Sequence, residues 1–118
     1  TTSENIYKHA NRHNTVTYYV CRPYITRHGN GPLCTDTKII NIEDPNNQYN
    51  DYQKSFRACE FDIKLLKHSL DIDKQFHRNK ERAIVFSHLD ELDDKILKQV
   101  KSLGLPVYGF EYERWQTL

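Results

Sequence analysis

The chain has 118 residues, with 17 lysines and arginines against 16 aspartates and glutamates, and a net charge of +1. That length suits a single domain with its own core, and the near-zero charge gives no long-range field for nucleic acid. No apolar stretch approaches the roughly 18 residues of a membrane span, and the amino terminus lacks the pattern of a secretory signal. We therefore expect a cytoplasmic domain whose partners include neither nucleic acid nor membrane.

Three cysteines, Cys21, Cys34 and Cys59, are odd in number and share no CxxC spacing. This pattern favours buried or half-buried thiols in a reducing compartment over a disulfide framework or a zinc site. None has the local signature of a catalytic nucleophile, and no set of nucleophile, base and orienting residue can be named from spacing.

The first predicted element is a helix that opens with the capping-box pair Thr1 and Glu4 and runs to about His13. His9 and His13 have the spacing of paired metal ligands, but no third ligand follows. Solvated histidines are the favoured interpretation, and no metal site is predicted. Because the chain begins at Thr1 and contains no methionine, we expect either a processed protein or a piece of a longer one.

Residues 16–25 are rich in Val, Tyr, Thr and Ile, which predicts a strand. The strand leads into a turn in which Gly29 and Gly31 allow positive φ and close backbone approach. Arg27 and His28 add a permanent cation and a titratable ring at the same point. Two interpretations stay open: a cradle for a phosphate or carboxylate, or a structural turn with solvated polar groups.

Residues 41–55 are poor in aliphatic side chains and predict a long loop of functional or mobile character. An amphipathic helix is predicted over residues 60–72. Its apolar positions recur at helical spacing and are Phe61, Leu65, Leu66 and Leu70.

Strands and helices alternate in the last third of the chain. Residues 83–86, Ala-Ile-Val-Phe, predict a strand buried on both faces of a parallel sheet. A helix follows that ends at Gly104, and residues 106–110 are predicted as the last strand. The helix has one apolar face, formed by Leu92, Ile96, Val100 and Leu103. This order predicts an α/β fold with a mixed, largely parallel sheet and flanking helices joined by right-handed crossovers.

Ser87, His88 and Asp90 directly follow the predicted buried strand. In open α/β sheets, ligands lie outside the carboxyl ends of the strands. An aspartate at that edge can accept two hydrogen bonds from N–H groups of a purine base, and the residue two positions earlier can lie over the ring. The alternative is that Ser87 or Asp90 caps a helix beginning near Glu91.

Four segments form an ordered pattern along the chain. Residues 2–5 read Thr-Ser-Glu-Asn, and residues 22–32 read Arg-Pro-Tyr-Ile-Thr-Arg-His-Gly-Asn-Gly-Pro, followed by Thr35 and Asp36. Residues 50–57 read Asn-Asp-Tyr-Gln-Lys-Ser-Phe-Arg, followed by Phe61 and Asp62. Residues 87–93 read Ser-His-Leu-Asp-Glu-Leu-Asp.

Taken together, these segments resemble the carboxyl-terminal half of adenylosuccinate synthetases, and most closely the phage and archaeal branch that makes 2-aminoadenylosuccinate nucleotides. The family segments read Thr-Ser-Ser-Asn, then Tyr-x-Thr-Arg-x-Gly-x-Gly-Pro and Thr-Glu. The phage-branch Asn-x-x-Gln-Gly-x-x-Arg with Leu-Asp follows, and Thr-Lys-Leu-Asp-x-Leu-Asp comes last. The resemblance covers nearly the whole chain and implies one domain over residues 1–118 with the fold of that half.

The family consists of ligases of purine biosynthesis that join aspartate to a 6-oxopurine nucleotide through a 6-phosphoryl intermediate, driven by a nucleoside triphosphate. The resemblance implies that Asp90 holds the base edge of the triphosphate, beside Ser87, and that His88 packs over the base. His88 stands where the family has lysine, so the family's GTP specificity is not carried over with it.

The resemblance also implies an acceptor-nucleotide or phosphate site and an aspartate site. The first would consist of Thr2, Ser3, Arg27, Gly29 and Gly31. Arg57 would fall near the family's aspartate-binding loop, where a guanidinium can grip a carboxylate with two hydrogen bonds.

Nothing like the family's phosphate loop, Gly-Asp-Glu-Gly-Lys-Gly, occurs in the chain. The family's catalytic aspartate and histidine also lie in its amino-terminal half. We therefore name no catalytic residue and expect the chain alone not to complete the reaction, for which Mg²⁺ and a purine nucleoside triphosphate are implied. The expected partners are a purine nucleotide, L-aspartate, and either further copies of the chain or a missing amino-terminal half. The alternatives are a free-standing protein that sequesters a purine nucleotide, and a ligand-free α/β remnant that serves as an interaction surface.

Overall fold

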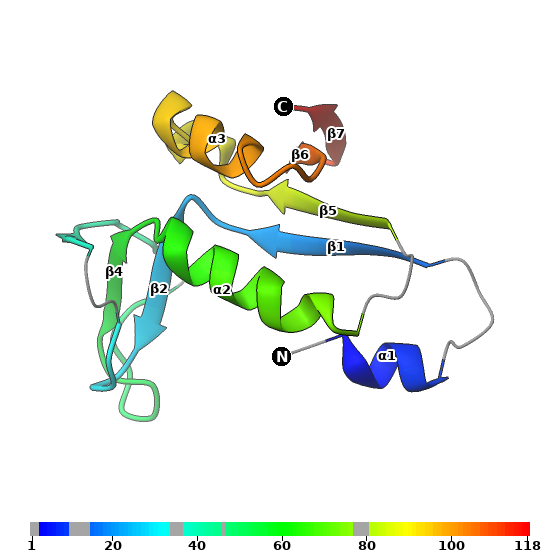
Figure 1. Cartoon of the computed structure of the whole chain (residues 1–118). Coiled ribbons are helices and arrows are strands. Elements are labelled where there is room, and N and C mark those ends of the chain that lie inside the picture. Colours follow the sequence, from blue (N-terminus) through cyan, green and yellow to red (C-terminus); the bar gives the residue numbers. More distant parts are fainter. Residues whose placement is uncertain (1–2, 10–14, 34–36, 46, 77–80) are drawn as a thin grey trace.

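A four-stranded sheet flanked by helices and a smaller three-stranded sheet make up the fold (Figure 1). The structure is a computed structural model that describes residues 3–9, 15–33, 37–45, 47–76 and 81–118. The elements in chain order are α1 (Glu4–His9), β1 (Val16–Cys21), β2 (Tyr24–His28), β3 (Ile39–Ile40), β4 (Phe56–Glu60), α2 (Ile63–Lys74), β5 (Glu81–Phe86), the 3-10 turn η1 (Leu89–Glu91), α3 (Asp94–Lys101), β6 (Val107–Glu111) and β7 (Arg114–Thr117).

Strand β5 lies at the centre of the larger sheet and pairs in parallel with β1 on one side and β6 on the other. Its residues Ala83 to Phe86 are all buried, which confirms the prediction of a buried parallel strand over residues 83–86. Strand β7 then pairs antiparallel with β6, so the sheet is mixed. The α/β class and the mixed sheet predicted from the sequence are both confirmed.

The hydrophobic core lies between this sheet and the helices α2 and α3, which cover the same face of it (Figure 1). Phe86 is fully buried and its ring lies 5.7 Å from that of Phe61, measured between ring centroids. The buried members of the core come from α2, β5, α3 and β6, and are Leu70, Ile84, Phe86, Val100 and Val107. The four residues predicted as the apolar face of the second helix all pack in this core, but α3 spans only Asp94–Lys101, so Leu92 and Leu103 flank the helix. On α2, Leu65 is half exposed and points away from this core.

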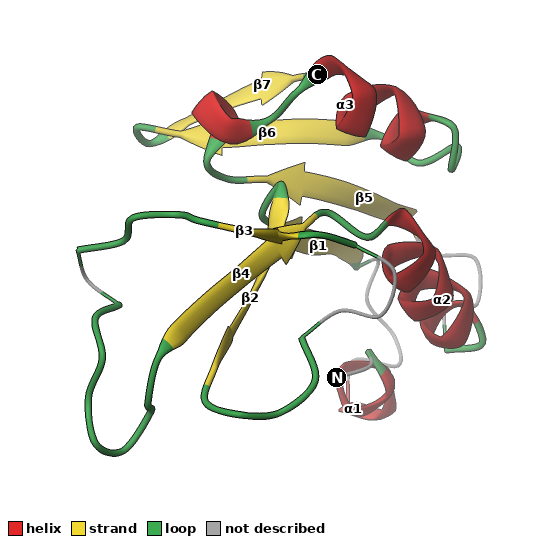
Figure 2. Cartoon of the chain, turned by 90° about the vertical axis from the view of Figure 1, so that its left-hand side faces the viewer, coloured by secondary structure: helices red, strands yellow, loops and turns green. Residues whose placement is uncertain are grey.

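The predicted strand over residues 16–25 is in fact two strands in two sheets. β1 ends at Cys21 and β2 begins at Tyr24. Pro23 separates them because its ring fixes φ and because it has no N–H with which to continue a ladder. The prediction of a single strand is therefore wrong, and the break carries the chain from the larger sheet into the smaller one, which projects from it (Figure 2).

The smaller sheet is antiparallel, in the order β2-β4-β3, and neither β3 nor β4 is predicted from the sequence. β4 reads Phe-Arg-Ala-Cys-Glu, which has no β-branched residue, and it forms because it has a partner strand on each side. Apart from an isolated bridge between Asn50 and Lys54, the described part of residues 41–55 contains no helix or strand. The predicted long loop is confirmed.

The carboxyl-terminal strand β7 was not predicted, since residues 106–110 were expected to form the last strand. The hairpin that leads to it turns through Tyr112 and Glu113, both at positive φ (47° and 61°). Such a turn usually carries Asn and Gly, so the sequence gives no hairpin signal at this point. No helix in the described part of the chain has the length and apolar character needed to cross a membrane.

A buried carboxylate holds the amino-terminal segment on the core. Asp73, near the end of α2, is 3% exposed and accepts hydrogen bonds from the backbone N–H and the hydroxyl of Ser3 and from the hydroxyl of Tyr19. α1 follows Ser3 directly, so a first helix is confirmed. The predicted cap at Thr1 and the predicted helix end near His13 lie outside the described residues.

Two neighbouring groups on β1 predict how stability changes with pH. Burial raises the pKa of the Cys21 thiol to about 11, and burial together with the Asp73 hydrogen bond raises that of the Tyr19 hydroxyl to about 12. The unfolded chain loses these protons first, so their contribution to stability is intact below pH 9 and is lost as the pH rises toward 12. We expect a loss on the order of 1–2 kcal/mol by pH 11, mainly from Cys21, because Tyr19 is only partly buried and its charge is screened by solvent. Urea denaturation at several pH values measures this loss, which Cys21→Ala should reduce.

Candidate functional site

The turn after β5 is held in place by the backbone of the neighbouring strand. The N–H of Ser87 donates to the carbonyl of Cys21 at 3.0 Å, which extends the β1–β5 pairing beyond Phe86. His88 then takes a left-handed conformation, with φ of 56°, and its Nδ1 lies 3.0 Å from the hydroxyl oxygen of Ser87. The imidazole also lies edge-on to the ring of Tyr24, with centroids 5.7 Å apart. The turn therefore sits beside the first residue of β2.

Asp90 does not cap the following helix, and neither does Ser87. α3 begins at Asp94, and its cap is Asp93, whose Oδ1 accepts the N–H of Ile96 at 2.7 Å. Asp90 lies one turn earlier, exposed in η1, and makes no hydrogen bond or ion pair within the described part of the chain. The capping interpretation is therefore wrong, and the Asp90 carboxylate is available to a ligand.

A glycine on β6 seats this turn against the sheet. A side chain at Gly109 would place its Cβ 2.7 Å from a methyl carbon of Leu89, the first residue of η1. Leu89 packs onto β6 through the space that Gly109 leaves. Burial raises the pKa of the Tyr24 hydroxyl. The charge of Arg22 opposes this shift, and nearby carboxylates, including those of Glu91 and Asp90, add to it. The packing of Leu89 thus holds Asp90 near Tyr24, the first residue of β2, and the Asp90 carboxylate takes no part in this packing.

Two arginines meet at the glycine-rich turn that follows β2. Arg27 and Arg57 are direct partners in the β2–β4 ladder. Arg27 Nη1 donates to the carbonyl of Pro32 at 2.9 Å, and Arg57 Nη2 donates to the carbonyl of Gly31 at 2.6 Å. A Cβ at Gly31 would lie 2.0 Å from Arg27 Nη2, so the absence of a side chain there lets the guanidinium lie against the turn.

These two guanidinium groups have no negative partner in the part of the chain that the structure describes. Arg57 Nε is buried and makes no hydrogen bond there. Like charges directly opposite on a sheet repel, and the hydrogen bonds to the carbonyls of Pro32 and Gly31 offset part of this repulsion. The arrangement leaves unused N–H donors of two permanent cations beside one turn, which suits a carboxylate or phosphate.

The loop of residues 41–55 contacts the same end of the smaller sheet. His28 Nε2 lies 3.1 Å from Oδ1 of Asn47, and the Asn47 amide donates to Asp44 at 2.6 Å. Gly29, at φ of 75°, donates its N–H to the carbonyl of Ser55 at 3.1 Å. The middle of the loop, at Asn47, and its carboxyl end, at Ser55, are thereby attached to the end of β2 and to the turn that holds the two arginines.

The sequence-predicted residues therefore form two groups and one outlier. Ser87, His88 and Asp90 lie together at the carboxyl end of β5, beside the start of β2. The glycine-rich turn at the other end of β2 brings together residues assigned above to two different sites, namely Arg27, Gly29, Gly31 and Arg57. Ser3 belongs to neither group, because its hydroxyl donates to Asp73 at 2.7 Å, and Thr2 lies outside the described residues.

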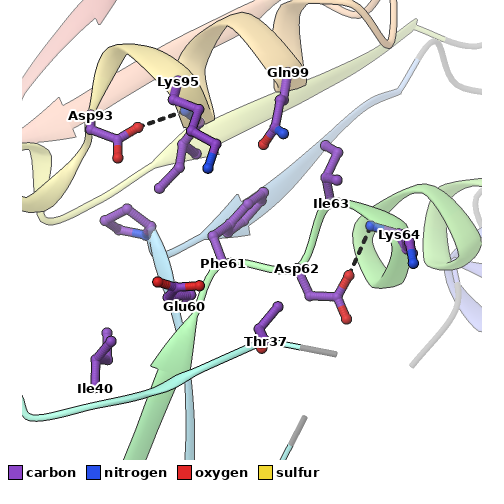
Figure 3. Close-up of a pocket in the computed structure, with 12 residues that line it drawn as sticks. Thr37, Ile40, Glu60, Phe61, Asp62, Ile63, Lys64, Asp93, Lys95 and Gln99 are labelled. Atoms are coloured by element: carbon purple, nitrogen blue, oxygen red, sulfur yellow. Dashed lines mark hydrogen bonds between the residues drawn. The ribbon is translucent and has the colours of Figure 1, made fainter. Parts of the chain in front are cut away.

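A pocket of about 390 Å³ lies between the starts of α2 and α3 (Figure 3). This pocket is not predicted from the sequence. Phe61 lies between the two helices, while Lys95 and Gln99 approach from α3. Asp62 and Asp93 cap the two helices, by accepting N–H groups of Lys64 and Leu65 and of Ile96 respectively. The volume is within the range of small-molecule sites. The two capping aspartates fall within the predicted helices, because the helices begin later than predicted, at Ile63 and Asp94.

Among the described residues, no three His, Cys, Asp or Glu side chains gather in a way that could hold a metal ion. No family model, no curated protein and no solved structure matches the chain.

Proposed function

We propose that this chain is the purine-nucleotide-recognising part of an adenylosuccinate synthetase-like ligase. The full reaction, the joining of aspartate to a 6-oxopurine nucleotide, would then require a second part that supplies the phosphate loop, the Mg²⁺ site and the catalytic base. One observation carries the proposal: Asp90 stands at the carboxyl end of a buried parallel strand with its carboxylate unused, since Asp93 caps α3.

The chemistry of the turn fits the edge of a guanine-type base. Such a base presents two neighbouring N–H donors, and an ionised carboxylate accepts two hydrogen bonds side by side. The exposed ring of His88, held by Ser87 and Tyr24, offers a flat surface next to that carboxylate. These contacts support recognition of the base and leave the sugar and phosphates to other groups.

The two arginines support a second subsite for an anion. Tyr24 begins β2 and Arg27 lies three residues further, on the opposite side of the strand by its alternation. The turn that holds Asp90 and the arginine pair would therefore bind two different ligands, rather than two ends of the same ligand. We assign the arginine pair to the carboxylates of L-aspartate or to the phosphate of the acceptor nucleotide.

The replacement Asp90→Ala tests the base subsite. We expect it to weaken binding of the preferred purine nucleoside triphosphate by about 1–3 kcal/mol, because N–H groups of the base lose their acceptor. Isothermal titration calorimetry with GTP and ATP measures the change. Asp94→Ala is the matched control, because Asp94 is also exposed near the start of α3 but is not its cap. Equal affinity of the two variants would contradict the role of Asp90.

Reconstitution separates the ligase from a free-standing binding protein. Both subsites lie within this chain, so nucleotide binding by the chain alone is expected in either case. Addition of a phosphate-loop-bearing amino-terminal half from a phage-branch synthetase, with Mg²⁺, aspartate and nucleotides, should yield succinylated nucleotide if the ligase proposal holds. Nucleotide binding without product under these conditions favours sequestration instead.

A further inference from the structure

The larger sheet has a second face that none of the described helices covers. Because side chains alternate along a strand, the residues next to the core positions point to this other side. They come from all four strands and are Val16, Tyr18, Val20, Glu81, Ala83, Val85, Tyr108, Phe110, Trp115 and Thr117. We call this surface the aromatic face.

Aromatic rings dominate this surface and contact one another. The rings of Tyr18 and Trp115, on the two outer strands, lie 5.6 Å apart between centroids, and Trp115 lies 5.1 Å from Phe110. They roof over the small side chains of the central strand, so that Ala83 and Val85 are buried. The rings themselves stay open to solvent, with Tyr18 at 49% and Trp115 at 58% exposure.

Three of the four strands of this mixed sheet, β1, β5 and β6, are parallel. All-parallel sheets are almost always covered on both faces, because helical crossovers supply a layer on each side. Here α2 and α3 both lie on the core face. The exposed apolar residues of the aromatic face are those that a second layer would bury.

We propose that the aromatic face is the interface between two copies of this chain, related by a two-fold axis. An interface of this kind is formed by the same patch on both copies, so a charged side chain near its centre would face the same charge on the other copy. The strand positions of the aromatic face carry no charged side chain except Glu81, at the starting edge of β5. The surface is therefore complementary to itself.

The exposed area is sufficient for such a dimer. An aromatic side chain buries ~150–250 Å² and a valine less, so the exposed fractions of Val16, Tyr18, Val20, Phe110 and Trp115 amount to roughly 500 Å² per copy. Two copies would bury about 1,000 Å², the lower bound for a specific interface. A patch of this size is also at the upper end of what monomers expose. Trp and Tyr at its centre are the residue types that contribute most to binding energy at interfaces.

Sedimentation across the micromolar range tests the proposal, with Val20→Lys as the disrupting variant. Val20 is 73% exposed in the single chain, so a lysine there leaves the monomer folded. In the dimer it would set an unpaired charge into an apolar interface, and we expect the dissociation constant to rise by ~100-fold. Ile39→Lys is the matched control, since Ile39 is 76% exposed but lies on β3 in the smaller sheet. It should leave the dimer intact.

Fluorescence provides an independent measurement, because Trp115 is the single tryptophan of the chain. Its emission should shift to the blue as the dimer forms, and Val20→Lys should abolish that shift. A protein that remains monomeric, with emission independent of concentration, would overturn the proposal and assign the face to a different partner. A dimer that Val20→Lys leaves unchanged would overturn it as well, because the interface would then lie elsewhere.

Discussion

Replacement of Phe86 by alanine is expected to destabilise the fold by about 3–5 kcal/mol. The Phe86 side chain is fully buried at the end of the central strand and contacts Phe61, which lies just before α2. Truncation removes this contact and leaves a cavity that strands of a sheet cannot close by moving together. A domain of this size has only ~5–15 kcal/mol of stability, so a large share would be lost.

Urea denaturation followed by circular dichroism measures this effect. Tyr52→Ala removes a similar aromatic side chain from a site that is 97% exposed, and it should change the stability by less than about 0.5 kcal/mol. If both variants unfold at the same urea concentration, Phe86 does not hold the core together as described.

The second large effect is expected at Asp73. Asp73→Ala leaves the N–H and hydroxyl of Ser3 and the hydroxyl of Tyr19 without their shared acceptor in a buried site. Each unpaired polar group costs about 1–3 kcal/mol, and partial access of water to Tyr19 reduces the total to about 3–4 kcal/mol. The amino-terminal segment should detach first, because it depends on this carboxylate for its contact with α2.

Hydrogen exchange resolves this local effect from global unfolding. In Asp73→Ala the amide of Ser3 should lose its protection, while amides of β5 should retain theirs at low denaturant. Asp71→Ala is the control, because Asp71 lies two residues earlier on the same helix with its side chain exposed. Protection of Ser3 that survives Asp73→Ala would contradict the anchoring role of the carboxylate.

The sequence predicts the centre of the fold better than its borders. Residues 83–86 form a continuous apolar run and the apolar residues around α3 recur at helical spacing, and both patterns identified core residues because burial dictates their side chains. β4 has no β-branched residue and depends on its partner strands, and the hairpin turn before β7 lacks the usual Asn and Gly. The strand break at Pro23 was not predicted, because residues that favour strands lie on both sides of the proline.

The candidate site is predicted less completely. Asp90 was correctly predicted to follow a strand, but whether it caps a helix was left open. Three aspartates, Asp90, Asp93 and Asp94, lie within five residues, and each is a candidate cap. Only the position of the first helical residue decides that Asp93 is the cap. The meeting of Arg27 with Arg57 was out of reach, since it depends on the register of two strands, one of which was not predicted.

The order of strands in the larger sheet also bears on how the chain folds. Residues 81–118 contain β5, α3, β6 and β7, whose contacts join neighbours in sequence. β1 must instead find β5 across the whole smaller sheet and α2, which closes a long loop before any contact is gained. We expect the carboxyl-terminal unit to form early and β1 to dock last. The joining of the two sheets, and with it the seating of Ser87 against Cys21, is then the late step of folding.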